Sequence, residues 1–134
     1  MSDESRTVLF ICHHGAAKSV LAAADLRTLA TNRGIRIAAQ AAGTEPDQAV
    51  LPAVIQAVGS DEGDFAQVKP HRVTQDELLS AWRVITFNLE PIDLPADRPD
   101  AERWDDVPAV SEDFLGAREA IGRHLDRLIE DLDR

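Results

Sequence analysis

Short apolar runs recur along this chain of 134 residues, and each is followed by a longer stretch with helical periodicity. The apolar runs are rich in β-forming residues and are bounded by polar or turn residues. They predict strands over 7–11, 36–42 and 83–87, with a further short strand near 103–104. Four prolines between 91 and 108 exclude a helix or a central strand from the rest of that segment.

The stretches between the strands carry helix start and stop signals. Helices are predicted over 17–33, 46–58 and 74–81, and from 111 to the end of the apolar stripe at 132. Gly34 and Gly59 stand where a helix commonly ends, and Thr74 with Glu77 forms a capping box. Ser111 is the predicted N-cap of the last helix, ahead of the acidic pair Glu112–Asp113.

Alternating strands and helices predict an α/β fold with a parallel sheet. We expect a three-layer αβα sandwich with four parallel strands, in which the first strand is central and the last helix packs across one face. No repeat, low-complexity tract or linker interrupts the chain, so residues 1–134 are predicted to form one domain. Ligands of such sheets bind at the carboxyl ends of the strands, where the winding reverses.

The net charge of the chain disfavours some classes of binding partner. The chain has 14 basic and 24 acidic residues, a formal net charge of −10, which disfavours nucleic acid and anionic membranes as partners. No apolar run approaches membrane-spanning length, and the N-terminus is too polar and acidic for a signal peptide. A single cysteine excludes an intramolecular disulfide and fits a reducing compartment, so a cytoplasmic location is expected. Oligomeric state is not indicated.

The segment from Cys12 to Ser19 has the strongest chemical signal. It joins the first predicted strand to the first helix, where backbone N–H groups and the positive helix end converge on one point. Such a loop binds anions, and the same field favours the thiolate form of the cysteine. Cys12-His13-His14 lacks the spacing of a metal site, so neither a metal nor another cofactor is expected.

Four motifs in order resemble the low-molecular-weight protein tyrosine phosphatases and the structurally related arsenate reductases. In that family a strand ends in Cys, and five residues later Arg-Ser opens a helix; here the frame is Cys12, five residues and Lys18-Ser19. A Ser-Ala-Gly-Thr-like turn is matched by 41–44, and a basic segment containing His by 69–72. Trp104-Asp105-Asp106-Val107-Pro108 resembles the family's general-acid loop, with altered spacing.

The resemblance implies a role for each matching residue. Cys12 is expected to attack phosphorus as a thiolate, and the Ser19 hydroxyl to help keep it ionised. Asp106, or else Asp105, is expected to protonate the leaving oxygen. The oxyanion is expected to be held by the loop residues His13, His14, Gly15, Ala16, Ala17, Lys18 and Ser19.

Three departures from the family pattern keep alternatives open. Lys18 replaces the planar Arg that grips two oxygens, Gly15 replaces a bracing Asn, and Ala17 replaces a second Cys. The leading expectation is a weakened phosphatase acting on a phosphorylated protein (phosphotyrosine) or a small phosphomonoester. A second is an arsenate reductase that uses an external thiol, since a lone cysteine excludes resolution by further cysteines of the chain. A third is a non-catalytic descendant that binds an oxyanion or a phosphoprotein.

Overall fold

A four-stranded parallel sheet forms the centre of the computed structural model, which describes residues 6–13, 17–46, 52, 54 and 70–132. The strands are β1 (Arg6–Cys12), β2 (Ile37–Gly43), β3 (Arg83–Thr86) and β4 (Glu102–Arg103). Their order is β2-β1-β3-β4 and every neighbouring pair is parallel. The predicted parallel sheet with its first strand in the interior is therefore confirmed.

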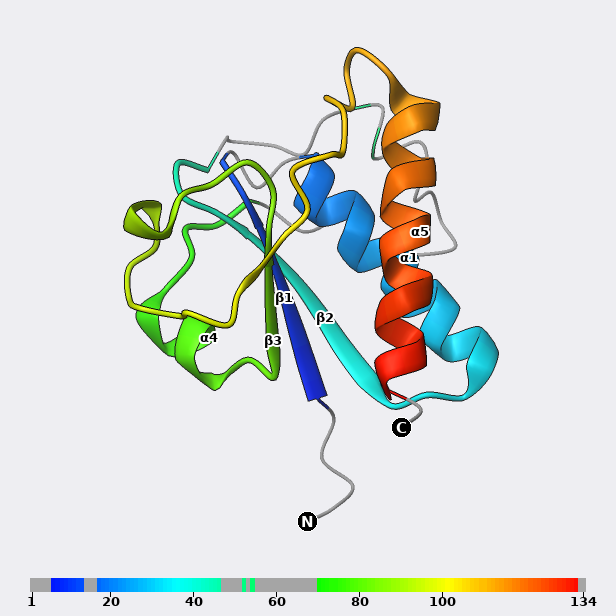
Figure 1. The fold of residues 1–134 in the computed structure, drawn as a ribbon, viewed down its shortest axis with the longest axis horizontal. Coiled ribbons are helices and arrows are strands. Elements are labelled where there is room, and N and C mark those ends of the chain that lie inside the picture. The colour runs from blue at the N-terminus through cyan, green and yellow to red at the C-terminus, as the bar shows by residue number, and fades with distance from the viewer. Residues whose placement is uncertain (1–5, 14–16, 47–51, 53, 55–69, 133–134) are drawn as a thin grey trace.

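Helices cover both faces of this sheet, as Figure 1 shows. The helices α1 (Lys18–Arg33) and α5 (Phe114–Leu132) lie together on one face, and α4 (Gln75–Ser80) lies on the other. A 3₁₀ turn, η2 (Pro91–Asp93), interrupts the proline-rich segment between β3 and β4. The three-layer αβα architecture is thus confirmed.

Most of the helix predicted over 46–58, with Gly59, lies outside the described residues. In the described part of the chain no helix is long and apolar enough to cross a membrane.

Strand β1 is buried on both faces, which explains its unbroken apolar sequence. Val8, Phe10 and Cys12 belong to the core cluster shared with α1 and α5. Leu9 and Ile11 belong to a second cluster on the α4 side. Because alternate side chains of a strand point to opposite faces, the residue at the end of β1 has to face α1. The cysteine therefore lies on the same side of the sheet as the helix that follows it.

An aromatic cluster fixes the carboxyl ends of β3 and β4 against β1. The ring centroids of Phe10, Phe87 and Trp104 lie 5.7–6.3 Å apart in pairs, and each residue is no more than 2% exposed. Aromatic pairs at such distances add to the stability given by burial alone. The backbone N–H of Trp104 also donates to the Thr86 carbonyl. The segment that follows Trp104 is thereby held beside the end of β1.

The helix ends follow the local signals with one exception. Gly34 ends α1 in the left-handed conformation, with φ +67°, and Thr74 and Glu77 form the predicted capping box of α4. The prediction of Ser111 as N-cap of α5 is wrong: α5 begins at Phe114, and the Asp113 carboxylate accepts from the Gly116 N–H at 2.9 Å. Asp113 is a capping residue type too, so the signal was present two positions later.

Replacement of glycine by alanine is predicted to have opposite effects on stability at two positions, Gly34 and Gly122. At Gly34 the positive φ disfavours any side chain, although an added Cβ meets no atom within 4 Å. Gly122 lies inside α5, and an added Cβ there also meets nothing within 4 Å. We expect Gly34→Ala to lower the free energy of unfolding by about 1 kcal/mol. Gly122→Ala should raise it by a similar amount, about 1 kcal/mol, through helix propensity. Urea denaturation of both variants checks this, and shifts of the same sign would contradict it.

Candidate active site

The thiol of Cys12 meets a buried hydroxyl at the junction of β1 and α1. Cys12 is 7% exposed and Ser19 is fully buried, with Sγ 3.1 Å from Oγ. The contact joins the last residue of the strand to the first turn of the helix. A hydroxyl at this distance is within hydrogen-bond reach of the sulfur.

The start of α1 is suited to an anion. The helix begins at Lys18, with Ala17 in the N-cap position, where no side chain caps it and no acidic residue lies in the first turn. The leading N–H groups of a helix have no intrahelical acceptor and carry the positive end of its dipole. The predicted loop residues His14, Gly15 and Ala16 lie outside the described residues. The described part of the loop thus supplies Cys12, the α1 N-terminus and Ser19.

His13 is held by the turn that follows β2. Its Nδ1 lies 3.0 Å from Thr44 Oγ1, and its Nε2 lies 3.4 Å from a Glu45 carboxylate oxygen. Backbone bonds run in parallel, because the Thr44 N–H donates to the Cys12 carbonyl and the Glu45 N–H to that of His13. Arg72, from the predicted basic segment, donates to the Thr44 carbonyl at 2.9 Å. The turn after β2 therefore holds the backbone of Cys12 and His13 at the carboxyl edge of the sheet.

The ammonium group of Lys18 is bound by an amide. Its Nζ donates to Asn88 Oδ1 at 2.8 Å. Desolvation by burial lowers the pKa of Lys18, although Cys12 and Asp105 attract its charge and oppose the shift. An amide oxygen takes one of the three ammonium hydrogens and brings no negative charge. The other donors of Lys18 remain for a second acceptor.

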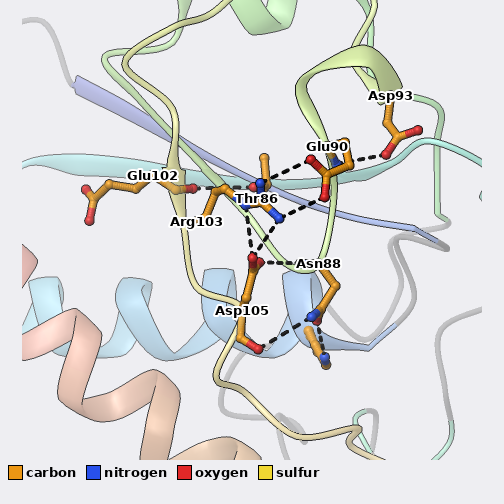
Figure 2. A network of polar contacts seen from close by, with 8 residues as sticks. Thr86, Asn88, Glu90, Asp93, Glu102, Arg103 and Asp105 are labelled. Carbon is orange, nitrogen blue, oxygen red and sulfur yellow. Dashed lines mark hydrogen bonds and ion pairs between the residues drawn. The ribbon is translucent and has the colours of Figure 1, made fainter.

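Asn88 also holds the segment that follows β4, as Figure 2 shows. Its backbone N–H donates to Asp105 Oδ1 at 2.8 Å, and its Nδ2 donates to the Asp105 carbonyl at 3.4 Å. Asn88 is in the left-handed conformation, with φ +60°, which Asn tolerates better than most residues. Arg103 donates to the second oxygen of Asp105 at 2.9 Å and also to both carboxylate oxygens of Glu90. A continuous chain of contacts thus runs from Lys18 through Asn88 and Asp105 to Arg103.

The neighbouring Asp106 faces α5. Its Oδ1 accepts from His124 Nε2 at 2.8 Å, and the His124 ring stacks on Trp104 with centroids 4.5 Å apart. The hydrogen bond from His124 holds the pKa of Asp106 below its ordinary value. The two candidate acids are therefore separated: Asp105 joins the Lys18 network, and Asp106 joins α5.

Sequence reasoning missed Asn88 and Arg103. A polar residue directly after a buried strand, at the carboxyl edge of a parallel sheet, was a usable signal for Asn88. Arg103 lies in the proline-rich segment, where no pattern marked its role. Among the described residues, no group of three or more His, Cys, Asp or Glu side chains could hold a metal ion.

Comparison with known proteins agrees with the resemblance inferred from the motifs. A protein of Halobacterium salinarum described as "Putative arsenate reductase" is 27% identical over 107 residues, which are 78% of this chain and 75% of that protein. The low-molecular-weight protein tyrosine phosphatase of T. tengcongensis superposes with a TM-score of 0.81 at 17% identity, covering 95% of this chain and 99% of that one. No protein-family model matches the chain.

A third similar protein is an arsenate reductase of known structure. The thioredoxin-dependent arsenate reductase Cg_ArsC1′ of Corynebacterium glutamicum gives a TM-score of 0.73 at 25% identity, covering 96% of this chain and 62% of that one. The chain therefore has the fold shared by low-molecular-weight phosphatases and arsenate reductases, as its motifs predicted. Because this fold serves both activities, the choice between them has to come from the site.

The pair of Asp106 and His124 predicts a pH-dependent stability. A carboxylate whose pKa is lowered by folding stabilises the protein above its unfolded pKa of about 3.9, and this contribution is lost as the pH falls through the folded value. We expect Asp106→Asn to destabilise the protein at pH 5–6 and to have a much smaller effect below about pH 3. Denaturation at several pH values measures this. The same substitution in a His124→Gln background is the control, and an equal cost there would contradict the pairing.

Proposed function

We propose that the protein is a phosphatase that cleaves phosphotyrosine or a small phosphomonoester through a cysteinyl-phosphate intermediate. The observation that carries the proposal is the contact of the Cys12 thiol with the Ser19 hydroxyl at the uncapped start of α1. This arrangement supports the proposed role of Cys12 as nucleophile, because the helix end beside it would attract an oxyanion. The fold, which phosphatases and arsenate reductases share, is compatible with this proposal.

The proposed reaction has two steps. The Cys12 thiolate attacks phosphorus, an S–P bond forms, and the P–O bond to the leaving group breaks. Asp105 gives the leaving oxygen its proton. Water then attacks phosphorus and passes a proton to Asp105, the S–P bond breaks, and inorganic phosphate is released with the thiolate restored.

Asp105 is preferred to Asp106 as the proton donor. Asp105 contacts Asn88, the residue that binds the Lys18 ammonium, whereas Asp106 is engaged by His124 on α5. Asp105 accepts from Asn88 and Arg103 before substrate arrives. Catalytic hydrogen bonds commonly rearrange when substrate binds, so this resting geometry is compatible with the role.

Lys18 is proposed to stabilise the charge that develops on the phosphoryl oxygens. An ammonium supplies charge without the two-pronged geometry of a guanidinium. Loss of one strong oxyanion donor costs on the order of 10²–10³ in rate in other enzymes, so slow turnover is expected. The contact with Asn88 partly compensates, because it fixes where the flexible lysine side chain ends.

Arsenate reduction is the second candidate, favoured by the Halobacterium relative. Here Cys12 attacks arsenic(V) and water leaves. An external thiol then attacks the Cys12 sulfur, so that a mixed disulfide forms and arsenite departs with the electron pair of the S–As bond. A second external thiol restores Cys12 and forms the external disulfide. The single cysteine of the chain makes the external thiols necessary. Such thiols are abundant in the cytoplasm, where we place the protein.

Hydrolysis of para-nitrophenyl phosphate is the first test. We expect slow turnover by the wild type, none by Cys12→Ser, and a gain of about tenfold or more in Lys18→Arg, because Arg restores the bidentate donor. Arsenate-dependent oxidation of an added thiol, without phosphatase activity, would favour the reductase instead. No turnover of either kind, with phosphate still protecting Cys12 from alkylation, would indicate an oxyanion-binding protein.

Asn88 is predicted to act as a positioning residue for Lys18. Its role is measured by how well phosphate protects Cys12 from iodoacetamide. Asn88→Gly keeps the positive φ but removes the amide, and Asn88→Asp places a negative charge beside the ammonium. We expect protection to decrease from wild type to Asn88→Gly and to be weakest in Asn88→Asp, by about tenfold.

The pH dependence of phosphate protection shows whether Asn88 positions Lys18 or has only a structural role. The pKa of Lys18 is lowered by burial, so wild-type protection should decline at a lower alkaline pH than an ordinary lysine would cause. A carboxylate beside the ammonium opposes that shift, so the decline should move to higher pH in Asn88→Asp. Equal protection and unchanged pH profiles in all three proteins would contradict the assignment.

A further inference from the structure

A cavity of about 420 Å³ lies between the η2 turn and β4, outside the chemistry proposed for Cys12. Its apolar wall comes from the proline-rich segment, with Leu89, Leu94 and Ala101 packed against the α4-side core. The volume is in the range that binds small organic molecules. Charged side chains complete the lining and determine which molecules fit.

Both arginines that line the cavity already donate to acceptors of the protein, and each of them contacts at least one carboxylate. Arg98 donates to the Asp100 carboxylate and to the carbonyls of Leu78 and Trp82. Arg103 donates to Glu90 and to Asp105 (Figure 2), and its Nη2 lies within 3.2 Å of both carboxylates. An anionic ligand would have to displace these acceptors. The cavity is therefore a poor site for an anion.

Asp97, in contrast to the two arginines, is a charged residue of the lining whose charge is not compensated. It lines the same cavity, is exposed, and has no hydrogen-bond or ion-pair partner among the described residues. Glu90, paired with Arg103, is the other carboxylate of the lining. An apolar wall beside an uncompensated carboxylate complements a ligand with an apolar body and a positive charge.

We propose that this cavity is a second binding site, for a small organic cation such as an ammonium or amidinium group carried on an apolar body. The apolar part packs against Leu89 and Leu94, and the cationic group pairs with Asp97. Recognition rests on the cavity volume, its apolar wall and the unpaired charge, and it does not depend on the proposed phosphatase reaction.

Phenethylammonium is a suitable probe, because 2-phenylethanol and 3-phenylpropionate are its neutral and anionic analogues. Each is titrated into ¹⁵N-labelled protein and followed by amide chemical shifts. We expect phenethylammonium to shift amides of residues 86–103, with a Kd on the order of 1 mM, as suits a ligand of its size. The alcohol should bind at least fivefold more weakly and the carboxylate more weakly still.

Two variants test the assignment of charge. Asp97→Asn should weaken phenethylammonium at least fivefold, whereas Glu119→Gln, a matched loss of an exposed carboxylate on α5, should leave it unchanged. Cys12→Ser should bind as the wild type does, which separates this cavity from the oxyanion site. Equal binding of the three probes, an unchanged Kd in Asp97→Asn, or shifts outside residues 86–103 would each overturn the proposal. Circular dichroism verifies that each variant is folded.

Discussion

Burial of β1 on both faces is the constraint on which the site depends. Leu9 and Ile11 pack toward α4, and Phe10 packs toward α1 and α5. The alternation leaves no choice for the next residue, so the Cys12 sulfur faces α1 and meets Ser19. A shift of one residue in the pairing of β1 would turn every side chain to the other face, and the thiol would be buried against α4. The hydrophobic pattern that specifies the fold therefore also specifies the direction of the Cys12 thiol.

Strand ends and helix caps, which depend on neighbouring residues, could mostly be predicted from the sequence. Contacts between residues far apart in the sequence could not. Strand ends agree with expectation within about one residue, because two-sided burial produces apolar runs that are easy to recognise. The capping box of Thr74 and Glu77 needs only neighbouring residues, and it forms. The start of α5 was predicted too early, because several capping residues follow one another and packing decides which is used. Asn88 meets Lys18 across 70 positions of sequence, so no local pattern could specify that contact.

In the proposed oxyanion site, Lys18 stands where the phosphatases that the chain resembles have an arginine, and this changes how the site can be organised. A guanidinium has its geometry built in, whereas an ammonium on four methylene groups has to be placed by its surroundings. Asn88 supplies that placement with a neutral acceptor, so the positive charge is oriented without being neutralised. The lowered pKa of Lys18 indicates that burial outweighs the attraction of Cys12 and Asp105. A carboxylate in place of Asn88 would hold the lysine more strongly, but it would also cancel the charge that an oxyanion needs.

Arg103 connects the two proposed sites. Its guanidinium contacts Asp105, which continues through Asn88 to Lys18, and it also contacts Glu90 at the cavity, with Nη2 shared between the two carboxylates. The proposed oxyanion would bind at Lys18, and the proposed cation would pair with Asp97 in the cavity that Glu90 also lines. A cation at Asp97 would also attract the Glu90 carboxylate and so oppose its hold on Arg103. Binding free energies are reciprocal, so an oxyanion must change the affinity for the cation by the same factor as the cation changes the affinity for the oxyanion. The network in Figure 2 would therefore be the route by which the two proposed ligands influence each other.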